Sequence, residues 1–369
     1  MVDFAAAVDD SFLEQLQLED LEKGGRKCIS DEERAAVLAI LEGKDYKLSA
    51  GGSLSNTLVA ISRMSKYATR HPGATMPYGR QNLSVSVACS LGPDPLGDFY
   101  RSKLGRAGVQ VLSPAADTGT TGSVVVLTTP DANRTMLSYQ GTSASMDYTP
   151  TLDANVTGAG VLIVEGYLWE MPETINCIKK AIATARKNGT KVALTASDAS
   201  CVERHGMEFW SLLEDGSIDV FFANEAEALA MCAIKGVDVA NAPAAVDYLS
   251  QHCKLVAVTA GRHGSYLRRN KQTAHVLPFW TEKPPVDTCG AGDAYAAGVI
   301  YGLVSGAELE EMGQMGSRIA SAVISHAGAR FTVGDAEELS RERLFNRPYS
   351  NAPVQQLDSA ENSLDDVYS

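Results

Sequence analysis

The chain has 369 residues, of which 45% are hydrophobic, and this is enough to bury one large core with a small accessory layer. Its formal net charge is −13 and Lys and Arg form no cluster, which excludes the electrostatic mode by which proteins bind nucleic acid. No apolar run reaches the length of a membrane span, and the seven scattered cysteines contain no C-x-x-C pair, which indicates a reducing compartment without disulfides or a zinc site.

The first third of the chain contains a glycine turn and two segments of alternating hydrophobicity. Gly51 and Gly52 precede a helical stretch, and by itself such a pair is an ordinary N-cap turn. Residues 84–90 and 122–129 alternate between apolar and polar side chains. This alternation predicts an antiparallel hairpin.

Short apolar strands then alternate with helical patterns. We expect strands at 161–165, 191–195, 220–222 and 255–259, and helices at 173–188, 226–234 and 243–253. This alternation predicts right-handed crossovers and a mostly parallel sheet between helices, an α/β fold. Ligands bind such sheets beyond the carboxyl ends of the strands, where motifs at Asn224, Thr259 and Asp293 can converge. Residues 346–369 are polar and aperiodic, which predicts a disordered tail.

The most informative segment is residues 287–298, with the sequence DTCGAGDAYAAG. Gly290 and Gly292 let consecutive N–H groups point inward at a helix N-terminus, where the dipole favours an anion such as phosphate. The Asp293 carboxylate would repel that phosphate, so its presence in the turn indicates a catalytic role. One such role is that of a base for an alcohol that accepts the phosphoryl group. The alternative is an ordinary turn at the start of a helix.

The run D-T-x-G-A-G-D at 287–293 resembles the C-terminal signature of the ribokinase-like, or PfkB, carbohydrate kinases. Residues 50–57, AGGSLSNT, resemble the second signature of that family at the usual distance. The resemblance covers about residues 1–335. Residues 8–13, 92–97 and 165–168 make the resemblance strongest to the adenosine-kinase-like branch. The sequence also looks most like that of the plastid PfkB-type proteins of plants.

The resemblance implies a ribokinase-like three-layer αβα sandwich with a mostly parallel central sheet and a small antiparallel β lid. It places a kinase domain at residues 1–345, with lid segments within 1–30 and 84–141. It implies an ATP-dependent phosphotransferase acting on a sugar or nucleoside hydroxyl. Such a protein is a monomer or homodimer in the chloroplast stroma or the cytoplasm, with no nucleic-acid or membrane partner. The alternative is a non-catalytic plastid regulatory or assembly protein that retains the kinase fold.

The resemblance also assigns the reacting groups and the acceptor site. Asp293 is the implied base, and the backbone of Gly290, Ala291 and Gly292 forms the anion hole. The residues implied to hold the acceptor are Asp3, Gly51, Gly52 and Asn56. Arg134, in the lid hairpin, is a candidate to hold phosphate, and the alternative is a solvated charge on a hairpin.

The nucleotide and cation sites follow from three further motifs. Asn224 with Glu227 fits the family's N-x-x-E motif, in which Glu227 organises Mg²⁺ through water, although such a tetrapeptide is also a common helix start. The implied nucleotide site adds Thr259, Gly261 and Gly264. Asp287, with the loop 327–329, resembles the family's site for a monovalent cation such as K⁺, and the alternative is that Asp287 only caps its turn.

One departure concerns Asp3. The family begins with a strand that carries G-x-G-x-x-x-x-D, whereas this chain opens with Met1-Val2-Asp3-Phe4. Asp3 fits the aspartate. We expect the segment before it to have been trimmed, and the alternative is that a position in the central sheet is left unfilled. We therefore expect Asp3 to lie at a frayed terminus.

Overall fold

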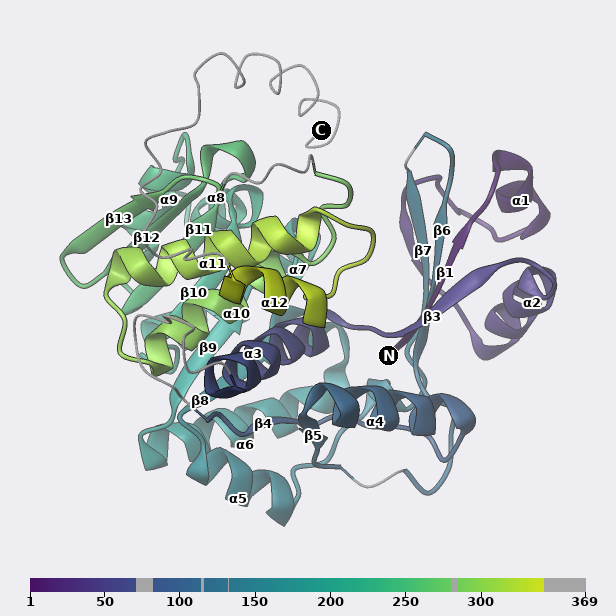
Figure 1. Cartoon of the computed structure of the whole chain (residues 1–369), viewed down its shortest axis with the longest axis horizontal. Coiled ribbons are helices and arrows are strands. Elements are labelled where there is room, and N and C mark those ends of the chain that lie inside the picture. The colour runs from purple at the N-terminus through teal and green to yellow at the C-terminus, as the bar shows by residue number, and fades with distance from the viewer. Residues whose placement is uncertain (71–81, 114–115, 132, 280–284, 342–369) are drawn as a thin grey trace. The chain divides into compact units, whose positions relative to one another are not determined.

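The computed structural model describes residues 1–70, 82–113, 116–131, 133–279 and 285–341, so the predicted tail at 346–369 lies outside the described residues. The chain divides into two compact units (Figure 1). The first unit comprises Met1–Ser55, Ser86–Asp147 and Pro172–Thr174, and the second comprises Asn56–Val85, Tyr148–Met171 and Ile175–Ser369.

The first unit is built on a five-stranded sheet with the order β2-β7-β6-β1-β3. Its strands are β1 (Val2–Ala7), β2 (Arg26–Cys28), β3 (Tyr46–Ala50), β6 (Ser123–Thr128) and β7 (Arg134–Tyr139). β6 pairs antiparallel with β7, which confirms the hairpin at that position, but β1 runs parallel to β6 and β2 runs parallel to β7. The sheet is therefore mixed and not wholly antiparallel, because the long connections between these pairs allow crossovers.

β3 also belongs to the sheet, although it lies outside the segments 1–30 and 84–141, and the extent of the lid stays a prediction. Two expectations about this unit are corrected by the structure. Within residues 84–90, β4 (Val85–Val87) pairs with β5 (Val109–Val111) in a separate two-stranded sheet and does not join the hairpin. Asp3 does not fray, because it lies inside β1, opposite Ser49 on one side and Val124 on the other.

Two helices lie beside the small sheet, α1 (Asp10–Gln15) and α2 (Asp31–Leu41). α2 begins with a capping box between Ser30 and Glu33. The Arg34 guanidinium of α2 lies 4.6 Å from the centre of the Tyr139 ring on β7, which joins helix and sheet through a cation–π contact.

The second unit is built on a six-stranded sheet with the order β13-β12-β11-β10-β9-β8. Four strands are parallel and match the expected positions: β8 (Val161–Glu165), β9 (Lys191–Thr195), β10 (Val220–Asn224) and β11 (Leu255–Thr259). The hairpin β12 (Ser265–Arg269) and β13 (Gln272–Val276) extends the sheet with antiparallel pairing, which the sequence did not predict.

Helices cover both faces of this sheet, which confirms the predicted three-layer αβα architecture (Figure 1). One face carries α8 (Glu225–Ile234) and α9 (Ala242–Leu249), and the other carries α10 (Ala291–Val304) and α11 (Leu309–Ile324). The remaining helices of the described chain are α3 (Ser53–Arg70), α4 (Pro95–Ala107), α5 (Pro150–Gly158), α6 (Pro172–Asn188), α7 (Ala199–Glu214) and α12 (Val333–Arg341).

Glycines allow α10 and α11 to pack backbone against backbone. A Cβ added to Gly298 would lie 2.6 Å from the Cα of Gly316, so a larger residue at 298 would force the helices apart. This close packing fixes the helix that carries the 287–298 motif, and it explains why that motif continues as an Ala- and Gly-rich run.

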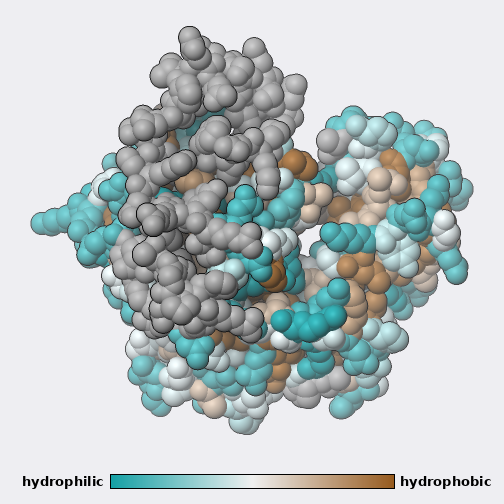
Figure 2. Space-filling model, in the orientation of Figure 1, coloured by the Kyte–Doolittle hydropathy of each residue, from teal (hydrophilic) through white to brown (hydrophobic). Residues whose placement is uncertain are grey.

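Among the described residues, none of the helices combines the length and the apolar character needed to cross a bilayer. Figure 2 shows hydrophilic and hydrophobic residues interspersed over the described part of the visible face.

Asp94 joins α4 to the segment before β6 through three hydrogen bonds. Its carboxylate accepts hydrogen bonds from the Gly97 N–H (2.7 Å), the Thr121 N–H (2.6 Å) and the Thr121 hydroxyl (2.7 Å), so it caps α4 and ties it to the chain before β6. Partial burial raises the pKa of Asp94, but the bonds from Thr121 and Gly97 outweigh burial and lower it. A lowered pKa means stability that is present above the ordinary carboxyl pKa and is lost as pH falls through the folded-state value.

We therefore expect Asp94→Asn to reduce the free energy of unfolding by about 1–2 kcal/mol at neutral pH and to flatten the acid limb of the stability curve. Urea unfolding at several pH values measures both. The control is Asp98→Asn, an exposed residue of the same helix. Equal losses in the two variants would mean that the Asp94 contacts do not hold this unit together.

Candidate active site

The start of α10 depends on a left-handed glycine. Gly290 has φ 79° and caps the helix, and a Cβ at this position would lie 2.2 Å from the Ala329 carbonyl oxygen. Only glycine combines this backbone conformation with so close an approach. The Ala291 N–H donates back to the Thr288 carbonyl at 3.2 Å, whereas the Gly292 N–H has no partner among the described residues. Of the predicted anion-hole residues, Gly292 therefore has the backbone N–H most available to a ligand, and its contact with an anion stays a prediction.

Asp293 lies in the first turn of α10, where it is half-buried. Its Oδ2 accepts a hydrogen bond of 2.9 Å from the side-chain amide of Asn56, and its backbone carbonyl accepts one of 3.2 Å from the Thr57 hydroxyl. Both partners lie on α3. The two sequence signatures, more than 200 positions apart, thus meet through Asn56 and Asp293.

Sequence reasoning missed Arg330, which completes this contact. The guanidinium Nε and Nη2 of Arg330 both donate to Asn56 Oδ1, each at 3.3 Å. Because Arg330 occupies the oxygen of the amide, the nitrogen of Asn56 is directed at Asp293. The available signal was position, since Arg330 follows immediately after the loop 327–329 that was assigned to the cation site.

The segment that carries Arg330 is held to α3 on its other side. The Arg63 guanidinium of α3 donates to the Phe331 carbonyl. Burial, followed by the charge of Arg330, lowers the pKa of Arg63, and the charge of Asp335 partly opposes this. Asp335 in turn accepts from the Thr332 N–H at 2.5 Å and lies 3.0 Å from His326 Nε2. These contacts give Arg330 a fixed position relative to Asn56.

Asp287 joins the turn before α10 to the end of α11. Its Oδ1 accepts from the Cys289 N–H at 2.8 Å and its Oδ2 accepts from the Gly328 N–H at 2.9 Å. The Val286 N–H also donates to the Ile324 carbonyl at 2.7 Å. Asp287 therefore caps its turn, which was the alternative interpretation, and it also contacts the loop 327–329. The cation assignment at Asp287 stays a prediction.

Asn224 and Thr259 lie side by side at the carboxyl edge of the six-stranded sheet, since they are register partners at the ends of β10 and β11. Gly261 and Gly264 follow in the turn to β12, where Gly264 has φ 85° and a Cβ would meet the Val276 carbonyl at 2.1 Å. The predicted nucleotide residues thus share one edge. Their contact with a nucleotide stays a prediction.

Glu227 forms a capping box with Asn224 at the start of α8. The Asn224 N–H and side-chain amide donate to the two carboxylate oxygens of Glu227 at 2.8 and 2.7 Å. Burial, with a smaller contribution from the charge of Asp198, raises the pKa of Glu227 to about 7. Two neighbouring carboxylates at a sheet edge fit a divalent cation, which would relieve their repulsion.

Within the described ranges, no three His, Cys, Asp or Glu side chains gather as a direct metal-binding cluster.

Two predicted acceptor residues of the first unit, Asp3 and Gly51, lie against each other. A Cβ on Gly51 would lie 1.7 Å from Asp3 Oδ2, so the Asp3 carboxylate occupies the space that the missing side chain leaves. Gly52 has φ +96°, a conformation that favours glycine. Arg134 is the first residue of β7, opposite Thr128, and is half-buried.

The chain belongs to the pfkB family of carbohydrate kinases, whose family model matches residues 25–335. The crystal structure of adenosine kinase from Sinorhizobium meliloti is similar, with a TM-score of 0.76 and 31% identity over 92% of this chain and 95% of that one. A probable sugar kinase from Rhizobium etli has a TM-score of 0.78 and 27% identity over 93% and 96% of the two chains. A nucleoside kinase of Methanothermobacter thermautotrophicus is 26% identical over 77% of this chain and 86% of its own length. These similarities confirm the predicted family and its ribokinase-like fold.

Gly290 and Gly306 form a matched pair for testing the start of α10. Both have positive φ (79° and 78°), but a Cβ on Gly306 would meet nothing within 4 Å. Gly306→Ala should therefore show only the backbone cost of about 1–2 kcal/mol. Gly290→Ala should cost about 1–3 kcal/mol more, because its methyl group overlaps Ala329. Thermal and urea unfolding measure the difference, and equal costs would contradict the close approach at Ala329.

Arg330 can be tested through the Asn56 side chain. In Arg330→Gln, loss of the two hydrogen bonds should speed hydrogen exchange at the Asn56 amide nitrogen by about tenfold. The measurement is the ¹H–¹⁵N exchange rate of that side chain, and Arg106→Gln, on α4 of the first unit, is the control. An unchanged rate in Arg330→Gln would show that Arg330 does not orient Asn56.

Proposed function

We propose that the protein transfers the γ-phosphoryl group of ATP to a hydroxyl group of a sugar or nucleoside. The observation that carries this proposal is the arrangement at α10, where a carboxylate, Asp293, stands in the same helical turn as the Gly292 N–H and is held there by Asn56. A base for an alcohol and a donor for phosphate oxygen are the two groups that this reaction requires.

In the proposed reaction, the acceptor oxygen forms a bond to the γ-phosphorus while the bond from that phosphorus to the β–γ bridging oxygen breaks. Asp293 takes the hydroxyl proton and ADP carries away the electron pair of the broken bond. Since phosphoryl transfer has a loose transition state, the proton moves late and an ordinary carboxylate is an adequate base. Asn56 and Thr57 orient Asp293, and orientation supplies much of the lowering of such barriers.

The start of α10 stabilises the transferring group. Its first turn presents the Gly292 N–H and the positive end of the helix dipole, and these groups need no rearrangement when charge develops. We assign Asn224, Thr259, Gly261 and Gly264 to the nucleotide, because they share the carboxyl edge of the sheet. Glu227 would hold Mg²⁺ through water, and the bound ion would supply positive charge that offsets the charge of the phosphate groups.

We assign binding of the acceptor to a carboxylate, an amide and two glycines, which offer hydrogen-bonding groups and leave space for a ligand. The Asp3 carboxylate can grip hydroxyl groups, and Gly51 and Gly52 leave the backbone accessible to a ligand. Asn56 retains a second amide hydrogen for the acceptor while the first bonds Asp293. Arg134 is assigned to phosphate oxygens through its guanidinium fork. Chloroplast localisation stays a prediction from the resemblance.

An acceptor screen tests the proposal directly. The purified chain is incubated with Mg²⁺, ATP and one alcohol at a time, including fructose, ribose and adenosine, and both ADP and the phosphate ester are quantified. One acceptor should yield ester and ADP in equal amounts. ATP binding without transfer to any acceptor would instead support a regulatory protein that retains the kinase fold, and release of inorganic phosphate would indicate a hydrolase.

Asp293→Asn should lower turnover about 100-fold or more while leaving ATP binding nearly intact, which is the usual scale for loss of a general base. Turnover and nucleotide affinity are measured separately, and Asp238→Asn, an exposed residue of the same unit, is the control. Near-native turnover of a folded Asp293→Asn variant would remove this residue from the role of base.

Activity should also rise with K⁺, because Asp287 and the loop 327–329 would fix the turn before α10 around a monovalent cation. The assay compares KCl with tetramethylammonium chloride at equal ionic strength, for the wild-type chain and for Asp287→Asn. If the wild-type chain is equally active in both salts, then Asp287 serves only as the cap of its turn.

A further inference from the structure

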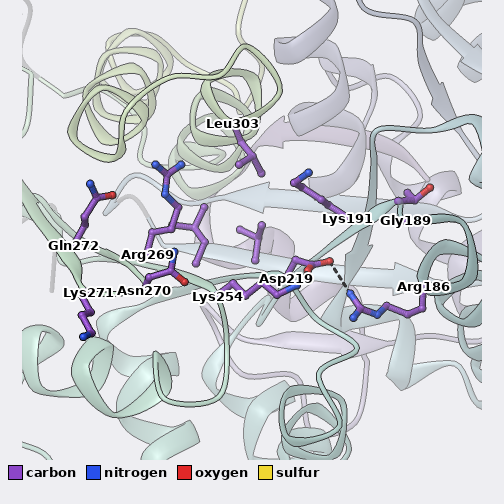
Figure 3. A pocket seen from close by; sticks show the side chains of 13 residues that line it. Arg186, Gly189, Lys191, Asp219, Lys254, Arg269, Asn270, Lys271, Gln272 and Leu303 are labelled. Atoms are coloured by element: carbon purple, nitrogen blue, oxygen red, sulfur yellow. Dashed lines mark hydrogen bonds and ion pairs between the residues drawn. The ribbon is translucent and has the colours of Figure 1, made fainter.

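A cavity lies at the amino edge of the six-stranded sheet, with a volume of about 990 Å³ (Figure 3). Its walls come from the ends of β9, β10 and β11, from the β12–β13 hairpin, and from the ends of α6 and α10. The lining residues are Arg186, Gly189, Thr190, Lys191, Asp219, Val220, Lys254, Leu255, Arg269, Asn270, Lys271, Gln272 and Leu303.

This cavity is separate from the candidate active site. Lys191, Val220 and Leu255 are the first residues of β9, β10 and β11, whereas Asn224 and Thr259 are the last residues of β10 and β11. Four residue steps along a strand correspond to about 13 Å. The cavity and the predicted nucleotide residues therefore lie at opposite edges of the same sheet.

The lining is strongly basic in a chain whose net charge is −13. Five side chains are cationic and one is acidic. The acid, Asp219, is buried and accepts from Arg186 at 3.0 Å, Lys254 at 2.7 Å and the Val192 N–H at 3.0 Å. Burial raises the pKa of Asp219, but the hydrogen bonds from Lys254 and Val192 outweigh burial and lower it. Asp219 thus stays ionised and fixes two of the cations in place.

The positive charges of the other three cations are balanced weakly or not at all by nearby acids. Lys191 and Lys271 form no ion pair or side-chain hydrogen bond in the described structure, and the acid that Arg269 pairs with, Glu308, is 3.7 Å away. The carboxyl ends of α6 and α10 each contribute about half a negative charge near the cavity. An excess of about two positive charges remains after these helix ends and Glu308 are counted.

We propose that this cavity binds a small anion with two or more phosphate groups. Guanidinium and ammonium groups from different elements line a space that is large enough for such a molecule. Asp219 holds Arg186 and Lys254 in place, and the guanidinium groups of Arg186 and Arg269 offer forked donors that match phosphate oxygens. The side-chain amides of Asn270 and Gln272 add neutral donors. A ligand of this charge removes the mutual repulsion that the cavity holds when empty.

Isothermal titration with inorganic tripolyphosphate in Mg²⁺-free buffer tests the proposal on the full chain. Lys191→Gln/Lys271→Gln removes the two unpaired ammonium groups, and both side chains are exposed, so folding is preserved. The control is Lys179→Gln/Lys180→Gln, which makes the same charge change at exposed positions on α6 outside the cavity. We expect about 100-fold weaker binding in the first double variant, about tenfold for each charge-assisted bond, and less than a twofold change in the control.

Further arms distinguish the sources of the phosphate. Equal weakening of tripolyphosphate binding and ATP binding by Lys191→Gln/Lys271→Gln would support recognition of the phosphate chain alone. Binding of ATP that exceeds that of tripolyphosphate and is weakened by Lys191→Gln/Lys271→Gln would support a nucleotide as the ligand. Equal weakening in the two double variants, no weakening in either, or binding no tighter than that of sulfate at equal ionic strength would overturn the proposal.

Discussion

The close approach of Gly290 to Ala329 is the constraint on which the rest of the candidate site depends. It brings the start of α10 against the loop that follows α11, and only a residue without a side chain permits it. Asp287 reinforces the contact from one side through the Gly328 N–H. Because α10 begins here and in this direction, Asp293 reaches Asn56 on α3.

Three segments far apart in the sequence therefore meet at one point, and each contributes a different group. α3 supplies the amide of Asn56, α10 supplies the carboxylate of Asp293 and the Gly292 N–H, and the loop after α11 supplies Arg330. The chain of contacts from Arg330 through Asn56 to Asp293 gives the amide one orientation. A side chain with one orientation is ready for reaction without reorganisation, which is the main advantage of a rigid site.

The two edges of the six-stranded sheet differ in charge, and helix direction contributes to this difference. The carboxyl edge carries acids and small residues beside the starts of α7 and α8, where Asp198 and Asn224 act as caps. The amino edge carries cations near the ends of α6 and α10, where positive charge is favourable. At the amino edge the cations exceed what these helix ends require, and this excess is the reason for the anion site that we propose there.

The sequence predicted the parallel strands well because each is a short apolar run with its own turn signals, as β8, β9 and β11 show. It did not predict which strands pair: β4 joins β5, and β3 joins β1, because pairing depends on partners distant in the chain. The glycine motif predicted that a helix starts near residue 291 and that Asp293 lies in its first turn, as α10 shows. Arg330 could not be found in this way, because only the fold brings it to Asn56. Asp3 was wrongly expected to fray because its neighbours, β3 and β6, come later in the chain.

The most direct test of the central claim is to watch the backbone of the α10 turn while it binds a mimic of the transferring phosphoryl group. Backbone ¹H–¹⁵N resonances are recorded before and after addition of Mg²⁺, ADP and aluminium fluoride. The account predicts a large shift at Gly292, whose N–H has no partner in the described structure, and a smaller one at Ala291, which must leave the Thr288 carbonyl. Binding of the complex with no change at residues 290–292 would contradict the claim that this turn is the phosphoryl-transfer site.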